Sequence, residues 1–355
     1  MKEVHFFVPD GIDDPSRPSG GNTYDRRLIG GLIASGWSVR EHALPGPWPL
    51  RDPAAVATLD AAVERIPDDA VALVDGLVAS TAPEVLVPQA RRLRLVVLVH
   101  MPLGHRPPDG KAPAVRKRER AVLSAAAAVV TTSAWSAGRL AALYGLPAGH
   151  VHVAEPGSDT AAPATGSAAG EELLCVAAVS FDKGHDVLLD ALTAVKDLSW
   201  RCVCAGSLDR EPAFVESLRR CTLESGLDGR VLFPGPRTGA DLDRSYAGAD
   251  VLVLASRAET YGMAVTEALA RGLPVIAADV GGVTEALGRC ADGTRPGVLV
   301  PVEDARALAA ALRSWLGDAN LRAHLRRTAG ERRHTLADWS TTTAVISRLL
   351  AGRAG

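Results

Sequence analysis

The sequence predicts an α/β protein made of two doubly wound parallel-sheet domains, and three observations carry this prediction. Its 355 residues are enough for about two domains. Short, continuous Val- and Leu-rich runs alternate with longer helical patterns, which is typical of parallel strands buried on both faces. The alternation stops at an uncharged segment, TAAPATGSAAG (160–170), which we interpret as an interdomain linker, and then restarts. We therefore expect two similar halves, over residues 1–160 and 161–337.

The first half opens with an apolar run that meets Asp10 almost at once, which indicates a buried strand and not a signal peptide. A helix follows after a long loop, because Leu28, Ile29, Leu32 and Ile33 share one helical face. The predicted helix covers 22–35, and the predicted strands cover 4–9, 38–44, 70–77, 93–101, 128–133 and 151–155.

The second half repeats the alternation and ends in a helical tail. The predicted strands are 173–179, 200–206, 231–235, 250–256, 274–279 and 297–301, and the predicted helices are 184–195, 211–225, 239–248, 262–271 and 304–316. The last 35 or so residues are helical only, with breaks at Gly317 and at Asp338-Trp339. This tail has no strand to pair, so it must pack on a structure that is already built.

Composition excludes several classes of function. The 39 Lys and Arg against 41 Asp and Glu give a net charge of −2, which argues against a nucleic-acid partner. No apolar run approaches the length of roughly 18–20 residues that spans a bilayer. Five cysteines, an odd number without a C-x-x-C pair, predict reduced structural thiols in a cytoplasmic protein. No His/Cys cluster has zinc-ligand spacing, so no metal is expected.

Ligands of such sheets bind outside the carboxyl ends of the strands, so we searched the loops that follow them. In PSGGNTY (18–24), Gly20 and Gly21 allow close backbone approach at a helix N-terminus; the alternative is a tight strand–helix turn. The segment is not G-x-G-x-x-G, which makes an NAD-dependent dehydrogenase a poor fit. His100 closes a buried strand and is expected to face a ligand, unless it is a satisfied core histidine.

A lysine at a helix start points to an anion. Lys183 opens a helix, where its charge opposes the helix dipole unless an anion is bound, so we predict a phosphate ligand. His185 and Asp186 are interpreted as capping or surface groups. Asp209 and Arg237, in later loops of the same edge, are weaker candidates.

The most informative segment is SRAETYGMAVTEALARGLPVIAADVGG (256–282). The amides near Gly262–Val265 form an anion site, and Glu259 and Glu267 lie before and after it. A bound diphosphate would lie between two carboxylates, of which one accepts hydrogen bonds from a sugar and the other from a ribose. The alternative is a capping acid and a surface acid.

A basic stretch, KAPAVRKRER (111–120), is a further candidate. It could meet an anionic acceptor or a membrane surface, but a solvated helix face is the favoured interpretation, because no exposed apolar face for a membrane accompanies it.

Together these segments resemble the retaining GT-B glycosyltransferases of family 4 (glycosyl transferases group 1). The stretch from Glu259 to Glu267 is similar to the family's Glu-x7-Glu motif, and the resemblance covers nearly the whole chain. The other segments that carry it are SGGNTY (19–24), His100, VVTTSAWSAGRL (129–140), EPGSD (155–159) and KGHDVLLDAL (183–192).

The resemblance implies a GT-B fold of two Rossmann-like domains that face a cleft, with a final helix, 338–355, that crosses back to the first domain. It implies that Glu267 binds the ribose and that Glu259 binds the donor sugar. It places His100 near the reacting sugar as a catalytic residue, together with Glu259. The remaining implied donor-binding residues are Gly20, Gly21, Lys183, Thr260, Tyr261, Gly262, Met263 and Ala264.

The chain departs from the family near Lys183. An Arg that shares the diphosphate charge is common there, but the neighbouring positions here are Ala177, Ser180 and Asp182; Arg257 or Arg237 would have to replace it. Glu155 stands where an Asn is usual.

The expected function is metal-independent transfer of a hexose-type sugar, with retained configuration and no cofactor. The donor is a nucleoside diphosphate sugar, with UDP ahead of GDP, and the acceptor is not identified by the sequence. The alternatives are a nucleotide-sugar-binding protein with little catalysis and a nucleotide-sugar 2-epimerase. The loop 10–21 and the segment 101–114 are expected to shape the acceptor pocket.

Overall fold

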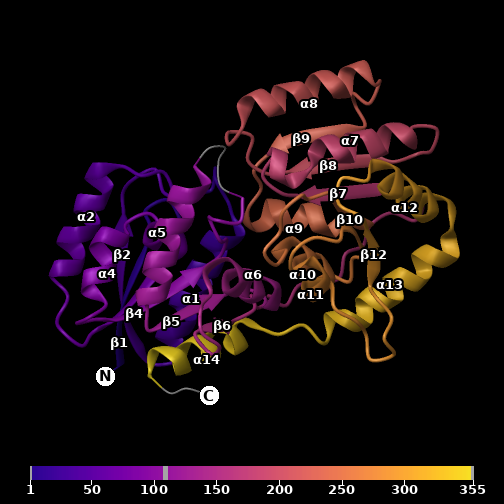
Figure 1. Cartoon of the computed structure of the whole chain (residues 1–355). Coiled ribbons are helices and arrows are strands. Elements are labelled where there is room, and N and C mark those ends of the chain that lie inside the picture. The colour runs from indigo at the N-terminus through magenta and orange to yellow at the C-terminus, as the bar shows by residue number, and fades with distance from the viewer. Residues whose placement is uncertain (1, 107–110, 353–355) are drawn as a thin grey trace. The chain divides into compact units, whose positions relative to one another are not determined.

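The computed structural model describes residues 2–106 and 111–352. Contacts divide the chain into two compact units (Figure 1). Unit 1 contains the residues up to 13, residues 21–157 and the chain from 339 on, and unit 2 contains residues 14–20 and 158–338. Each unit holds one six-stranded sheet in which every paired strand runs parallel. The predicted α/β class with two doubly wound sheets is thereby confirmed.

Unit 1 has the strand order β2-β1-β3-β4-β5-β6. Its strands β4 (RLVVLV) and β5 (AVVT) are apolar except at one end each, Arg94 and Thr131, which is typical of strands whose two faces are covered by helices. Its elements are β1 Lys2–Pro9, α1 Gly20–Ala34, β2 Trp37–Leu44, α2 Pro53–Glu64, β3 Val71–Asp75, α3 Gly76–Ala79, α4 Pro83–Gln89, β4 Arg94–Val99, α5 Ala112–Ala125, β5 Ala128–Thr131, α6 Ala134–Tyr144, β6 Val151–Val153 and α14 Trp339–Leu350.

Unit 2 has the strand order β12-β11-β10-β7-β8-β9. Helix α7 packs between α8 and α12, while α10 packs with α11 and α13. The elements are β7 Glu172–Val176, the 3-10 turn η1 Phe181–Lys183, α7 His185–Ala194, β8 Arg201–Ala205, α8 Pro212–Glu224, β9 Val231–Gly235, α9 Gly239–Ala247, β10 Val251–Leu254, α10 Met263–Ala270, β11 Val275–Ala278, α11 Val283–Leu287, β12 Gly297–Val300, α12 Ala305–Gly317 and α13 Ala319–Arg333.

The predicted strand 70–77 is too long at its carboxyl end. The Asp75 carboxylate accepts a hydrogen bond of 2.6 Å from the Leu77 amide and thereby caps the short helix α3, which begins at Gly76. The apolar run continues past Asp75, so the hydrophobic pattern hid the change from strand to helix.

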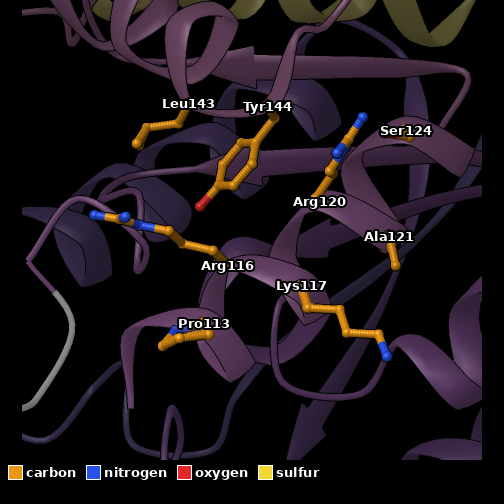
Figure 2. A pocket seen from close by; sticks show the side chains of 8 residues that line it. All are labelled: Pro113, Arg116, Lys117, Arg120, Ala121, Ser124, Leu143 and Tyr144. Carbon is orange, nitrogen blue, oxygen red and sulfur yellow. The ribbon is translucent and has the colours of Figure 1, made fainter. Parts of the chain in front are cut away.

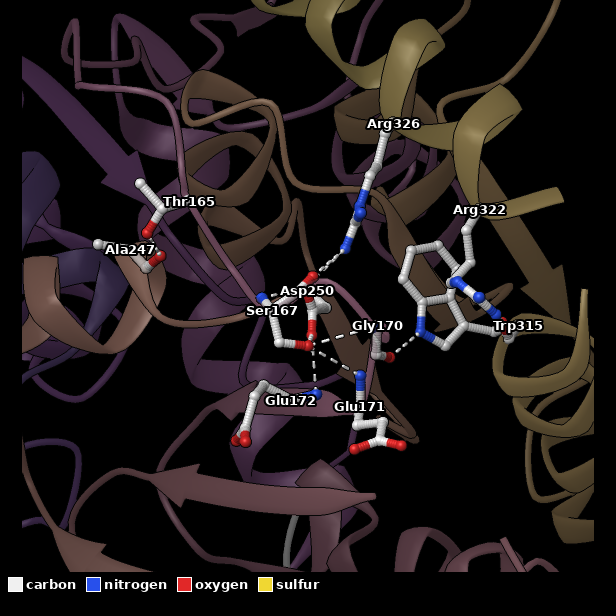
Figure 3. Close-up of polar contacts among 10 residues, drawn as sticks. All are labelled: Thr165, Ser167, Gly170, Glu171, Glu172, Ala247, Asp250, Trp315, Arg322 and Arg326. Atoms are coloured by element: carbon white, nitrogen blue, oxygen red, sulfur yellow. Dashed lines mark hydrogen bonds and ion pairs between the residues drawn. The ribbon is translucent and has the colours of Figure 1, made fainter. Parts of the chain in front are cut away.

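The linker-like segment is anchored on unit 2 by a buried carboxylate (Figure 3). Asp250 is 1% exposed and accepts hydrogen bonds from the Ser167 amide at 2.8 Å and the Ser167 hydroxyl at 2.6 Å. Arg326 completes the cluster with an ion pair of 2.6 Å to Asp250. The Trp315 indole donates to the Gly170 carbonyl at 2.8 Å. The whole segment 160–170 therefore belongs structurally to unit 2.

The final helix α14 packs on unit 1. The Trp37 indole donates to the Ser347 hydroxyl at 2.8 Å, and Arg94 donates to the Leu349 carbonyl at 3.0 Å. Gly31 of α1 lies so close to Thr343 that a Cβ there would meet its hydroxyl at 2.2 Å. Helix α14 thus closes the side of unit 1 formed by α1 and the start of β2.

Candidate functional site

The predicted donor residues of unit 2 lie where the sheet changes direction. The chain places β8 on one side of β7 and β10 on the other, which makes the β7–β10 pair the topological switch point. In open α/β sheets, ligands bind at the carboxyl ends of the strands at such a point. Lys183 follows β7 and Glu259 follows β10, so two loops far apart in sequence meet there.

Lys183 and Glu259 form an ion pair in this structure. The lysine Nζ lies 2.7 Å from Glu259 Oε1, and the Ser256 hydroxyl donates to the same oxygen at 2.9 Å. Both charged side chains are mostly buried, 24% and 13% exposed. The lysine positive charge at the start of α7 is therefore balanced by a carboxylate of the neighbouring loop.

Glycines shape the loop that carries Glu259. Gly262 has φ +102° and caps α10, which places the predicted segment Thr260–Ala264 at the amino end of that helix. A Cβ on Gly281 would lie 1.6 Å from the Glu259 carbonyl oxygen, and the Gly282 amide donates to that carbonyl at 3.2 Å. Gly281 and Gly282, which follow β11, thus pack directly against the backbone of Glu259.

Glu267 lies one turn into α10, and its carboxylate is bound by a tyrosine hydroxyl. The Tyr246 hydroxyl of α9 donates to Glu267 Oε2 at 2.7 Å. Burial raises the pKa of Glu267 above its ordinary value, although the Tyr246 hydrogen bond and Arg271 act in the opposite direction. The Tyr261 side chain, in contrast, is 6% exposed and packs in the core of unit 2, so only its backbone can serve a ligand.

Arg257, a candidate to replace the missing cation beside Lys183, is paired with two acids in this structure. Its guanidinium binds both oxygens of Asp186 at 2.8 Å, pairs with Glu303 at 2.7 Å and stacks on Phe181 at 3.9 Å. Two carboxylates therefore neutralise it. Asp186, predicted as a capping or surface group, is 36% exposed and also accepts hydrogen bonds from backbone amides in the first turn of α7. Arg237, the other candidate, donates to the Ser245 hydroxyl at 2.7 Å.

The interpretation of His185 as a capping or surface group is wrong. Its side chain is 1% exposed and lies in the core, where Nε2 faces the Cys175 sulfur at 3.7 Å. The physical reason is that α7 begins at His185 itself, so its first side chain turns down onto the sheet. Asp209 is exposed in the loop after β8.

In unit 1, His100 lies in a cluster with two acids that the sequence analysis missed. His100 Nε2 is 2.7 Å from an oxygen of Asp25 and 3.5 Å from an oxygen of Asp75, and both acids are buried. Gly21 is close to this cluster, because a Cβ there would lie 3.2 Å from the His100 ring. Asp75 lies at the carboxyl end of a buried strand, as His100 does. This shared position could have identified Asp75 as a site residue from the sequence.

The charges of this cluster are strongly coupled. Burial opposes the charged imidazole, but the carboxylates of Asp25 and Asp75 outweigh it and raise the pKa of His100. Burial and the charge of Asp25 raise the pKa of Asp75 to about 7. The Asp75 carboxyl can therefore gain or lose its proton near neutral pH beside the ring of His100, which suits a site that handles hydroxyl groups.

The basic helix α5 lines an open hollow with α6 (Figure 2). The hollow has a volume of about 450 Å³, and Arg116, Lys117 and Arg120 line it together with Tyr144. The buried Glu119 of α5 accepts hydrogen bonds from the amides of residues 103 and 104 and from the Tyr144 hydroxyl. The predicted acceptor segment 101–114 is thus anchored at residues 103–104, while its residues 107–110 lie outside the described part of the chain.

Two groups of side chains in the described ranges, 2–106 and 111–352, offer metal-ligand atoms within 4.8 Å of one another. They are Asp25, Asp75 and His100 in unit 1, and Cys175, His185 and Cys204 in unit 2. In the same ranges, no helix combines the length and the apolarity that a membrane span requires.

Comparison with known families assigns both halves of the chain. The model of the glycosyl transferases group 1 matches residues 170–318, and that of glycosyltransferase family 4 matches residues 3–162. A D-inositol 3-phosphate glycosyltransferase of Jonesia denitrificans is 34% identical over 63% of this chain and 57% of its own length. A similar enzyme of Catenulispora acidiphila is 32% identical over 68% of this chain and 61% of its own length. The chain thus spans about three fifths of these curated relatives.

Solved structures show the same fold. Sucrose-phosphate synthase of Thermosynechococcus elongatus superposes with a TM-score of 0.81 over 99% of both chains, at 21% identity. Anabaena HepE, in complex with UDP and glucose, gives a TM-score of 0.78 over 99% of this chain and 100% of its own, at 19% identity. Both sheets and their helices thus form a GT-B fold, and the chain belongs to the group 1 glycosyltransferases of family 4.

Proposed function

We propose that the chain transfers a hexose-type sugar from a nucleoside diphosphate donor to an acceptor, with retention of the anomeric configuration and without a metal cofactor. UDP-sugars are proposed ahead of GDP-sugars. The observation that carries the proposal is the pairing of Lys183 with Glu259 at the switch point of unit 2, directly before the amino end of α10. The HepE complexes with UDP and UDP-glucose support this choice of donor.

In this proposal the donor diphosphate takes the place of Glu259 as the partner of Lys183. The Lys183 ammonium and the first amides of α10, from Gly262 to Ala264, stabilise the charge of the leaving group. Glu259 is then released to accept hydrogen bonds from the sugar hydroxyls. Glu267 accepts those of the ribose, with the Tyr246 hydroxyl holding its carboxylate in place.

Unit 1 contributes the acceptor side of the proposed reaction. His100 is proposed to act near the reacting sugar, with Asp25 and Asp75 holding its ring and its charge. Gly20 and Gly21 open α1 and leave room for a ligand close to the backbone. The proton of the acceptor hydroxyl passes to the donor phosphate on the same face, which accounts for retention without a protein nucleophile.

Nucleotide binding tests the donor part. We would measure the thermal midpoint with UDP, GDP, ADP and dTDP, with Mg²⁺ or with a chelator, for the wild type, Glu267→Gln and the control Glu224→Gln. Glu224 is exposed on α8, far along the chain from the proposed site. A nucleotide at about 100 times its Kd adds about 2.7 kcal/mol, or about 5–10 °C. The expected result is a shift for UDP in the wild type and the control, without Mg²⁺, and its loss in Glu267→Gln.

Product analysis then separates transfer from the alternatives. The donor is UDP-glucose, and D-inositol 3-phosphate is the first acceptor because both relatives are named for it. Transfer with an α-linked product from the α-linked donor supports the proposal. Binding without transfer or donor hydrolysis supports a nucleotide-sugar-binding protein, an alternative that the neutralised Arg257 favours. Conversion of the donor to its epimer supports the epimerase, and no nucleotide binding at all refutes the proposed donor site.

A further inference from the structure

Three cations line the hollow between α5 and α6 in unit 1. They are Arg116, Lys117 and Arg120, and Tyr144 of α6 lies between Arg116 and Arg120 (Figure 2). The volume of about 450 Å³ is within the range of small-molecule sites. None of the three cations belongs to the proposed donor site or to the cluster around His100.

The positive charge of this hollow is not balanced by neighbouring acids. Elsewhere in unit 1 a surface arginine such as Arg51 pairs with an acid, Glu84, at 2.7 Å. In the described ranges, 2–106 and 111–352, Lys117 and Arg120 have no ion pair. Glu119 is the one acid in the sequence of α5, but it is fully buried and binds the amides of residues 103 and 104. The hollow therefore keeps its positive charge.

The arrangement of these cations on α5 is unfavourable without an anion. Arg116 and Arg120 are four residues apart, and Lys117 and Arg120 are three apart, so they are neighbours on one helix face. Like charges at these spacings destabilise a helix. The first turn of α5 also contains no acid and no side-chain cap, although a helix N-terminus favours negative charge. A bound anion would relieve the repulsion between the cations.

One of the three cations is already held in position. Arg116 Nε donates to the Gly104 carbonyl at 2.9 Å. Its two terminal nitrogens have no partner among the described residues, so they remain as donors for a ligand. Gly104 lies four residues after His100, so an anion on Arg116 would also act on the residue that ties down this loop.

The lining of the hollow indicates the chemical class of its ligand. Ser124, one turn after Arg120, adds a hydroxyl, whereas Ala121 and Leu143 supply apolar surface. Guanidinium, ammonium and hydroxyl donors together suit the oxygens of a phosphate, which carries about −1.5 to −2 at pH 7 as a monoester. The apolar surface suits the carbon skeleton that carries such a group.

We propose that the hollow between α5 and α6 binds a small soluble organic phosphate, with the phosphate group on Arg116, Lys117 and Arg120. The site is separate from the proposed donor site, and it does not depend on the proposed sugar transfer. Its connection to the rest of unit 1 is the bond from Arg116 to Gly104.

Calorimetric titration of the full chain with glucose 6-phosphate at low ionic strength tests the site, with glucose as the uncharged counterpart. The variant Lys117→Gln/Arg120→Gln removes two cations of the hollow, and the control Arg219→Gln/Arg220→Gln removes two exposed arginines of α8. The wild type and the control should bind glucose 6-phosphate and not glucose. The hollow variant should bind it about tenfold or more weakly, because each exposed cation contributes up to about a factor of five.

A third variant, Lys183→Gln, separates the hollow from the proposed donor site. Binding of glucose 6-phosphate should be unchanged in Lys183→Gln, and any binding of UDP should be unchanged in the hollow variant. Failure of the proposed donor site would therefore leave this test intact. Circular dichroism and the thermal midpoint confirm that each variant is folded.

Four results would overturn the proposal. The first three are no binding to the wild type, equal weakening in the two double variants, and loss of binding in Lys183→Gln. The fourth concerns vesicles of phosphatidylcholine with phosphatidic acid, which present a phosphate monoester on a lipid. Co-sedimentation that depends on Lys117 and Arg120, without binding of glucose 6-phosphate, would assign these cations to a membrane surface instead.

Discussion

The substitution Asp75→Asn is predicted to make the protein more stable at neutral pH, although it removes a charged group from the candidate site. Asp75 is buried, and its pKa is raised to about 7, against an ordinary value of 3.8. A raised carboxyl pKa stabilises the fold fully below pH 3.8, and this contribution is lost as the pH rises through about 7. The wild type therefore has to bury an increasingly costly carboxylate over this range, whereas asparagine remains neutral.

Asparagine also reproduces the contacts of protonated Asp75. Its carbonyl oxygen can accept the Leu77 amide, as Asp75 does at 2.6 Å, so the cap of α3 is retained. Its amide can donate to Asp25, as the protonated acid does. About three pKa units at 1.36 kcal/mol each make the variant about 4 kcal/mol more stable than the wild type at pH 7, and about equal at pH 4.

The assay is urea unfolding of the wild type, Asp75→Asn and the control Asp60→Asn at several values between about pH 4 and pH 8, where linkage predicts the change. Asp60 is an exposed residue of α2 in the same unit, so its variant should follow the wild type at every pH. The difference between Asp75→Asn and the wild type should grow by about 1.4 kcal/mol per pH unit and level off above pH 7. A constant difference across this range would show that Asp75 does not titrate near neutrality and would refute the reasoning.

Three further predictions concern packing and hydrogen bonding. Gly31→Ala should lower the free energy of unfolding by about 1–3 kcal/mol, because its Cβ would meet the Thr343 hydroxyl of α14 at 2.2 Å. Gly30→Ala, with nothing within 4 Å of its Cβ, should instead stabilise α1 by about 0.5–1 kcal/mol. Urea unfolding compares the two variants, and equal effects would contradict the packing of α14 on α1. Gly281→Ala should lower the thermal midpoint and weaken nucleotide binding, because its Cβ would lie 1.6 Å from the Glu259 carbonyl oxygen. The control Gly293→Ala also replaces a glycine with positive φ, but its Cβ has nothing within 4 Å, so it should lower the free energy of unfolding by only about 1–2 kcal/mol. Tyr246→Phe removes the hydrogen bond that lowers the pKa of Glu267, so this pKa should rise. The pH at which nucleotide binding reaches half its maximum should rise with it. An unchanged pH profile would show that the ionised Glu267 carboxylate is not needed for binding.

Most of the fold could be predicted because parallel strands buried on both faces have a simple sequence pattern, a continuous apolar run. Runs such as VLVL and VIAA are buried at every position, so their apolar character is continuous and their ends are sharp. The candidate donor residues were found for the same reason. Lys183 and Glu259 each follow such a run, and the switch point of the sheet brings the two loops together.

Residues whose partners come from other elements could not be predicted in this way. Asp25 lies on α1, Asp75 ends β3 and His100 follows β4, so their cluster depends on the strand order and not on any spacing. His185 was misinterpreted because a polar residue at a helix start usually faces water. Only the register of β7 with β8 shows that this helix start lies over two cysteines.

The charged groups around Lys183 are paired with one another within unit 2. A second guanidinium, Arg257, lies in the loop after β10, but Asp186 and Glu303 bind it through all three of its nitrogens. The remaining lysine is balanced by Glu259, so the pair is neutral as a whole. A diphosphate in the proposed site would exchange one anionic partner of Lys183 for another, and its second charge would depend on the amides of α10. Under the proposed function, the amino end of α10, which begins at Gly262, would therefore have to supply the stabilisation that a second cation beside Lys183 would give.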